Sequence, residues 1–271
     1  MAEAPPTTCG DNDKWLLLER RSSSDLPLVV RARDNAQVTE FSRQHSAIAV
    51  ICEVRRDLVN ENGMPMCMDE LYRIEDDLVA EASRHAQQAF HTASVTGDGR
   101  RVIYFALATG FPAGDLTSAT SPTCCVVSLT SDFDFDTYIE FVTPTLLDRQ
   151  WDGDRQVIGV LQENGDDGDQ LRAVDFWFYG SRPQLEALVS HLSSAGFRLN
   201  RWLDETGGVI LSQDCAAHMQ AFADITPFLI ATAEELGVTY DGWETFVVAK
   251  QSPTLPLKPS VFGKIFGQRK H

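Results

Sequence analysis

Apolar and polar positions alternate most regularly in the second half of the chain, where short alternating runs are separated by longer runs with helical spacing. Residues 174–179 alternate strictly, which is typical of a strand with one buried face. Leu185, Leu188 and Leu192 then recur at the spacing of an amphipathic helix. The later runs predict strands at 197–203 and 208–212, a helical segment at about 216–236 and a last strand at 240–248. This β-α-β-β-α-β order predicts a ferredoxin-like fold, with both helices on one face of an antiparallel sheet.

The first half of the chain follows a looser version of the same order. Its apolar runs predict strands at 14–20, 26–33, 47–55, 90–96, 101–108 and 124–129. Leu71, Ile74, Leu78 and Ala82 predict a helix that begins near Pro65 and ends near residue 87, and a further helix is expected at 135–147. The predicted fold class is α+β with two domains, the second a ferredoxin-like βαββαβ sandwich and the first a looser α+β sandwich of similar order.

Composition divides the chain into four segments. We expect a disordered arm at 1–13, an α+β domain at 14–149, the ferredoxin-like domain at 150–248 and a basic tail at 249–271. The boundary between the domains is predicted in the polar stretch 148–156, next to a short helix at 155–163. The tail has three prolines and no acidic residue, and it packs on the acidic body, binds a partner or stays mobile.

Charge separates the body of the chain from its tail. Residues 1–149 carry 13 basic and 23 acidic side chains, residues 150–248 carry 5 and 16, and residues 249–271 carry 5 and none, for net charges of −10, −11 and +5. Because phosphate backbones are bound by clustered Lys and Arg, we expect no direct nucleic-acid partner. No run approaches the roughly 18 apolar residues of a membrane span. An acidic body suits a protein that is soluble by self-repulsion, or one that docks on a basic polypeptide.

No catalytic or metal-binding motif stands out. The six histidines lie outside the patterns that pair histidine with a metal or a nucleophile, and no glycine-rich phosphate loop is found. The six cysteines form no C-x-x-C pair, which favours buried free thiols and a cytoplasmic protein. The acids at 132–136 lack the glycine and glutamate of a calcium loop, and the helical acids at 75–77 point about 100° apart. We therefore expect no catalytic residue, no metal and no cofactor.

One face of the second predicted sheet carries aromatic side chains. The odd positions of the strand at 174–179 and the even positions of the strand at 197–203 are expected on the face that the helices leave open, while the phase of the last strand is ambiguous. Such a face stacks bases, anchors a protein partner, or is covered by the first domain or a second copy. The negative charge argues against bases. The residues predicted to bind a partner are Asp175, Trp177, Tyr179, Trp202, Asp241 and Trp243.

The sequence Tyr240-Asp241-Gly242-Trp243 comes just before the end of the second half. Asp-Gly is typical of tight turns. We expect Asp241-Gly242 to turn the chain from the preceding helix into the last strand, with Tyr240 and Trp243 on either side of the corner. Fold maintenance is the favoured role of these two rings, and a contribution to a partner surface is the alternative.

Several of these motifs occur together in known families. The acidic helix and loop after residue 152, the strand "VDFWFY", the helix end "AGF" and the run "YDGWET" resemble the RraB-like family, regulator of ribonuclease E activity B. That resemblance implies a ferredoxin-like domain without catalytic residues, and the namesake is a small acidic protein that inhibits ribonuclease E by binding it. The motifs "ENGMP", "LYRIEDDLV" and "SVTGDGRRVIYFALA" within 14–147 resemble an uncharacterised family catalogued as domain of unknown function six-nine-five. The second resemblance implies no activity.

Charge, motifs and resemblance together predict a non-enzymatic, protein-binding regulator. Its expected partner is a protein, through a basic segment of a ribonuclease or of another RNA-processing factor. Two alternatives stay open, namely an immunity-type protein that neutralises a basic nuclease and an enzyme whose site lies between the domains. The sequence does not predict the oligomeric state.

Overall fold

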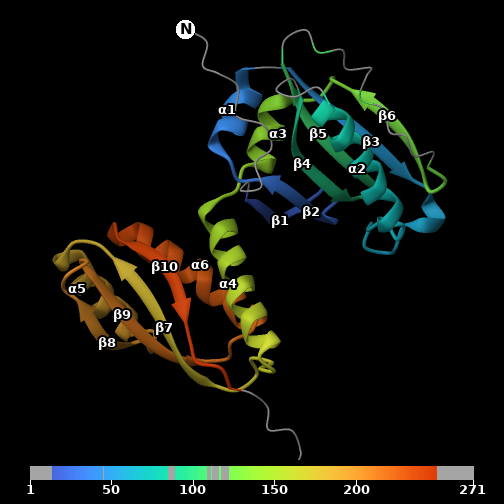
Figure 1. Ribbon diagram of the computed structural model, residues 1–271. Helices are drawn as coiled ribbons and strands as arrows, with labels where there is room; N and C mark the ends of the chain where they lie inside the picture. Colours follow the sequence, from blue (N-terminus) through green and yellow to red (C-terminus); the bar gives the residue numbers. More distant parts are fainter. Residues whose placement is uncertain are drawn as a thin grey trace, which may run out of the picture. The chain divides into compact units, whose positions relative to one another are not determined.

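The computed structural model describes residues 14–44, 46–84, 89–108, 111, 116 and 122–248 (Figure 1). The predicted arm at 1–13 and the basic tail at 249–271 lie outside these residues. The chain divides into two compact units, Met1–Asp154 and Arg155–His271, which we describe separately. No helix in the described part of the chain is long and apolar enough to cross a membrane.

The first unit is built on a six-stranded sheet with the order β1-β2-β4-β5-β3-β6. All of its neighbouring strands are antiparallel. Its strands are β1 (Trp15–Arg21), β2 (Pro27–Arg33), β3 (Ser46–Val54), β4 (Ala89–Gly97), β5 (Arg100–Leu107) and β6 (Cys125–Thr130). Its helices are α1 (Ala36–Gln44), the 3₁₀ turn η1 (Arg56–Leu58), α2 (Met68–Arg84), α3 (Phe135–Val142) and the start of α4 (Leu146–Glu163).

Both faces of this sheet are covered. Leu71, Ile74 and Leu78 of α2 pack against one face, where the even positions of β3, such as Val50, are fully buried. The opposite face carries a second apolar cluster that includes Tyr138 of α3. Strands buried on both sides read as continuous apolar runs, which is why β3 was predicted readily from its sequence.

Two helical regions differ from the sequence prediction. The structure forms α1, whose sequence "AQVTEFSRQ" has few apolar positions, and no helix was predicted there. The predicted boundary at 148–156 is helical, because α4 runs without a break from Leu146 to Glu163. The division between the two units, after Asp154, therefore falls inside a helix.

The second unit is a four-stranded antiparallel sheet with the order β10-β7-β9-β8. Its elements are β7 (Arg172–Tyr179), α5 (Arg182–Ser193), β8 (Arg198–Leu203), β9 (Gly208–Cys215), α6 (Met219–Leu236) and β10 (Thr239–Glu244). The order β-α-β-β-α-β with the first and third strands in the centre is the ferredoxin-like fold, as predicted. In the first unit, β6-β3-β5-β4 repeats the same strand order.

The helices α5 and α6 lie on one side of this sheet (Figure 1), and the core lies between them and the sheet. Phe176 and Phe178 of β7 and Phe222 of α6 are fully buried there. Ser181 caps α5 in a reciprocal arrangement with Gln184, which satisfies donors at the start of the helix. The opposite side of the sheet carries no described helix of this unit, so its strands present an open face.

Candidate functional site

The open face of the second unit is organised in rows across the strands. Trp177 of β7 is the register partner of Ile210 on β9, and Ile210 in turn pairs with Arg201 on β8. On the other side of β7, Trp177 pairs with Gly242, which places no side chain beside the indole ring. The predicted face of β7 is confirmed, because Trp177 and Tyr179 are half-buried while Phe176 and Phe178, which alternate with them, are fully buried.

Trp202 does not lie on this open face, so its predicted placement is wrong. The register of β8 against β9 shifts between Leu199 and Arg201, where a bulge inserts one extra residue. One inserted residue reverses the alternation of every later side chain in the strand. Trp202 consequently pairs with Val209 on the helix side, where the guanidinium of Arg182 lies 3.5 Å from the centre of its ring.

Trp202 borders a cavity of about 200 Å³ at this end of the sheet. The cavity is lined by Gly180, Arg182, Leu185, Trp202, Leu203, Asp204, Gly207 and Gly208. Arg182 is already engaged, because its guanidinium contacts Asp204 at 3.3 Å as well as stacking on Trp202. Trp202 therefore contributes to the packing around α5 and not to the open face.

Trp243 also lies on the helix side, so it does not join the open face. It pairs with Phe176 and stacks on Phe222, with ring centres 4.2 Å apart and planes 14° apart. A register shift between Tyr240 and Gly242 leaves Asp241 exposed at a bulge. Asp241-Gly242 is thus a bulge within β10 and not the turn that precedes it, and the prediction of a corner is wrong.

The helix before β10 ends at Gly237, in agreement with the predicted helical segment at 216–236. This residue has φ of 66°, a left-handed conformation that glycine adopts without steric cost. Fold maintenance, the role favoured for Tyr240 and Trp243, agrees with their burial, with exposed fractions of 4% and 7%. The open face thus retains three of the predicted partner-binding residues, Asp175, Trp177 and Tyr179, with Asp241 at its edge.

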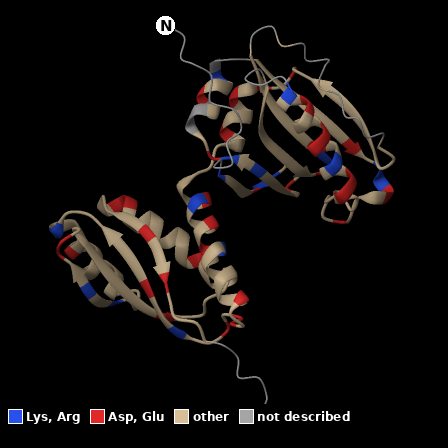
Figure 2. Cartoon of the chain, viewed as in Figure 1, with Lys and Arg blue, Asp and Glu red and all other residues tan. Residues whose placement is uncertain are grey.

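Charges on the open face are distributed unevenly. Asp175 accepts hydrogen bonds from Ser212 and, at 3.0 Å, from Asn200, so its carboxylate is held in place. The guanidinium of Arg201 lies 5.9 Å from the ring centre of Trp177. In Figure 2 the acidic positions of β7 and β10 lie side by side, and β8 carries basic positions. Arg201 and Ser212 also lie on this face and were not predicted from the sequence, because their positions depend on the register of β8 and β9.

The first unit contains a buried polar cluster around Glu75 of α2. Arg101 donates to its Oε2 through Nε at 3.0 Å, and Ser94 donates to the same oxygen at 2.6 Å. Arg31 reaches Oε1 at 3.0 Å. His91 Nε2 lies 2.8 Å from the hydroxyl of Ser94. A histidine, a serine and a carboxylate therefore meet in this unit, which is the arrangement closest to a catalytic one in the described part of the chain.

Burial prevents this cluster from acting as a catalytic site. Ser94 is fully buried and His91 is 4% exposed, so no substrate reaches the hydroxyl. Burial would raise the pKa of Glu75, but the charge of Arg101 and the hydrogen bonds from Ser94 and Arg101 hold that pKa below its usual value. Burial lowers the pKa of His91 to about 4, which leaves the imidazole neutral at pH 7. The cluster is a structural network that fixes α2 on the sheet.

The unfolding free energy is expected to fall as pH drops from 6.5 to 4, and His91 should cause part of this loss. In that range the unfolded chain takes up a proton on the imidazole while the folded chain does not. The full effect is at most about 3.5 kcal/mol, for about 2.5 pKa units at about 1.4 kcal/mol per unit. Urea unfolding of the wild type and of His91→Gln across this range should show a shallower pH dependence in the variant. The exposed His191→Gln is the control, and equal slopes in all three proteins would contradict the assignment.

The remaining candidate groups do not form a reactive site. Cys52, Cys67, Cys124, Cys125 and Cys215 are free thiols. Burial is the main reason that the pKa of Cys52 rises to about 12, which keeps that thiol protonated and unreactive. Within the described ranges, no group of three or more His, Cys, Asp or Glu side chains is arranged to hold a metal ion.

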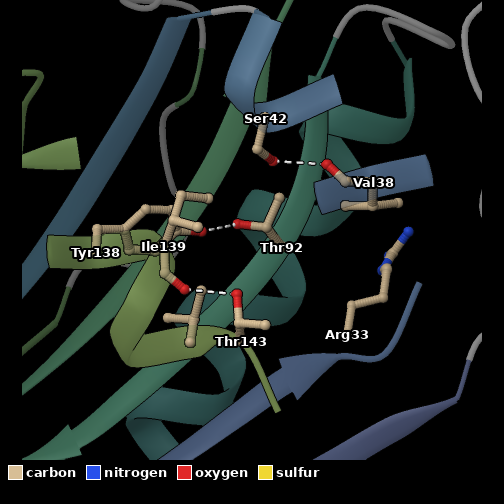
Figure 3. Close-up of a pocket in the computed structure, with 8 residues that line it drawn as sticks. Arg33, Val38, Ser42, Thr92, Tyr138, Ile139 and Thr143 are labelled. Atoms are coloured by element: carbon tan, nitrogen blue, oxygen red, sulfur yellow. Dashed lines mark hydrogen bonds between the residues drawn. The ribbon is translucent and has the colours of Figure 1, made fainter. Parts of the chain in front are cut away.

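A small cavity lies between α1 and α3 in the first unit (Figure 3). Its volume of about 20 Å³ is enough for one water molecule and too small for a substrate. Near it, the hydroxyls of Thr92 and Tyr138 lie 2.5 Å apart, and Ser42 donates to the carbonyl of Val38 at 2.8 Å. The lining residues are Arg33, Val38, Ser42, Thr92, Tyr138, Ile139, Val142 and Thr143. The Thr92–Tyr138 contact joins β4 to α3, the Ser42 bond lies within α1, and both serve packing.

The open face lies within the part of the chain that matches a family model. A comparison with curated proteins found no match. The family model described as Regulator of ribonuclease activity B matches residues 151–245. This range includes most of α4, the helices α5 and α6 and all four strands of the second sheet.

Proposed function

We propose that this chain is a non-enzymatic regulator that binds a ribonuclease or another RNA-processing protein through the open face of its second unit. The observation that carries the proposal is the family match, because it covers the whole sheet that forms this face. The arrangement most similar to a catalytic one, the cluster around Glu75, is buried.

The composition of the face fits a protein partner. Trp177 and Tyr179 are half-buried aromatic residues, the type that most often anchors protein interfaces. Gly242 leaves one side of the indole of Trp177 without a neighbouring side chain. The acidic positions on β7 and β10 would attract a basic segment of the partner and accelerate encounter, and they would repel RNA.

The first test measures cleavage of a fluorescent RNA by purified ribonuclease E with increasing amounts of the full chain. Inhibition without binding of the RNA itself, checked by gel shift, is the expected result. If the chain does not inhibit ribonuclease E, affinity capture from the native cell then tests whether it binds another RNA-processing protein. The proposal is overturned if the chain captures no RNA-processing protein, or if it binds RNA tightly itself.

Trp177→Ala is expected to weaken partner binding by at least about tenfold, because loss of an aromatic anchor typically costs about 2 kcal/mol or more. Trp202→Ala removes the same type of side chain from the helix side and is the matched control. Titration calorimetry with the captured partner measures both. Circular dichroism checks that each variant is folded. Equal affinities for the two variants would exclude the open face as the binding site.

A further inference from the structure

The chain leaves the second unit at a defined point. Beyond β10, Thr245 donates from its hydroxyl to the carbonyl oxygen of Ala173 at 2.8 Å. The backbone N–H of Val248 donates to Asp166 Oδ2 at 2.7 Å. These bonds hold residues 245–248 against the start of β7. The 23 residues that follow, 249–271, therefore begin beside the same end of β7.

The open face beside that point is acidic. Glu244 is the register partner of Asp175, and both lie near the start of β7. Asp241 is exposed at the bulge further along β10. We call Asp175, Asp241 and Glu244 the acidic strip. Arg198, the nearest basic residue of β8 by register, is paired with Asp214 at 3.0 Å and does not neutralise the strip.

Residues 249–271 have the opposite character. They carry five basic side chains and no acidic one, and they include a short apolar group, Val261, Phe262, Ile265 and Phe266. An extended chain covers about 3.3 Å per residue, so the eight residues 251–258 reach about 26 Å beyond Lys250. The eight residues of β7 have about the same length. The tail is thus long enough to follow the acidic strip and reach the aromatic pair.

We propose that residues 249–271 bind back on the open face of their own chain, with the lysines on the acidic strip and the apolar group against Trp177 and Tyr179. Because the tail is covalently attached, its effective concentration at the face is in the millimolar range, and a weak intrinsic affinity is sufficient. This inference rests on the proposed function, since a basic segment of the partner would have to displace the tail. The tail would then act as an internal competitor that sets the threshold for partner binding.

Limited trypsin digestion of the full chain tests the inference without any partner. Cleavage after Lys264 at low ionic strength should be about five times slower in the wild type than in the double variant Asp241→Asn/Glu244→Gln, because cleavage follows the population of the released tail. Glu234→Gln/Glu235→Gln, which removes two exposed charges from the end of α6, is the matched control and should behave as the wild type. High salt should raise the wild-type rate to that of the double variant.

An excess of a synthetic peptide with the sequence of residues 249–271 should likewise accelerate cleavage of the wild type. Equal rates in the wild type and both variants, unaffected by salt and by the peptide, would overturn the inference. Since no partner is present, this failure would leave the partner-binding proposal standing. Conversely, a protected tail in a chain that binds no ribonuclease would leave the inference standing and remove the proposed function.

Discussion

Asp166→Ala should lower the unfolding free energy of the second unit by about 3–5 kcal/mol, the typical cost of removing one partner of a buried ion pair. Asp166 and Arg172 have side-chain exposures of 0% and 1%, and the guanidinium donates to both carboxylate oxygens. The carboxylate also accepts from the backbone N–H groups of Gly168, at 2.9 Å, and Val248. Alanine would leave a buried cation and two backbone donors without their acceptor.

Asp169→Ala is the matched control, because Asp169 lies in the same loop and is exposed. Hydrogen exchange of the β7 and β9 amides in the full chain measures the stability of this unit separately from the first. The double variant Asp166→Leu/Arg172→Met should recover part of the loss, since apolar residues can replace a buried pair. A change for Asp166→Ala that is no larger than the change for Asp169→Ala would contradict the role assigned to the pair.

The Asp166–Arg172 pair also determines how the stability of the second unit responds to acid. The hydrogen bond from Arg172 is the main reason that the pKa of Asp166 lies well below its usual value. A carboxylate whose pKa is lower in the folded chain than in the unfolded chain raises the free energy of unfolding. This contribution is fully present above the pKa of the unfolded chain, about 4, and is lost as pH falls further. The pair therefore stays intact across the pH range in which His91 destabilises the first unit.

Strict periodicity is what made parts of this fold predictable. β7 alternates without interruption, and each of its residues lies on the predicted face. β8 and β10 each contain a bulge, and the inserted residues, Asn200 and Asp241, reverse the alternation after them. A bulge depends on the local twist of paired strands and not on a residue pattern, so Trp202 was placed on the wrong face and the face of Trp243 was left ambiguous.

The buried cluster of the first unit was partly visible in the sequence. Glu75 lies four positions after Leu71 and three before Leu78, so helical spacing puts it on the buried stripe of α2. The sequence interpretation considered it only as one of three adjacent helical acids that cannot converge on one metal ion. The partner that makes burial acceptable, Arg101, comes from β5, and only the sheet register brings the two together. Pairings between distant strands are set by the whole fold, which a local pattern does not contain.

Trp243→Ala is expected to destabilise the second unit by about 3–5 kcal/mol, as is typical of replacing a buried aromatic residue by alanine. The indole stacks on Phe222 and lies opposite Phe176, and the core between α6 and the sheet would lose both contacts. Trp177→Ala, a matched truncation on the open face, should cost less than about 1 kcal/mol because the ring is only half-buried.

Hydrogen exchange of the β7, β9 and α6 amides distinguishes these two truncations. The Trp243 variant should exchange faster throughout the unit, and the Trp177 variant should resemble the wild type. Circular dichroism at increasing temperature gives an independent measure, with a lower midpoint for the Trp243 variant. If the two variants were equally stable, then Trp243 would not be a core residue, and the bulge at Asp241 would not determine the face on which it lies. That outcome would return Trp243 to the partner-binding surface, whereas the expected one leaves Trp177 and Tyr179 as its aromatic residues.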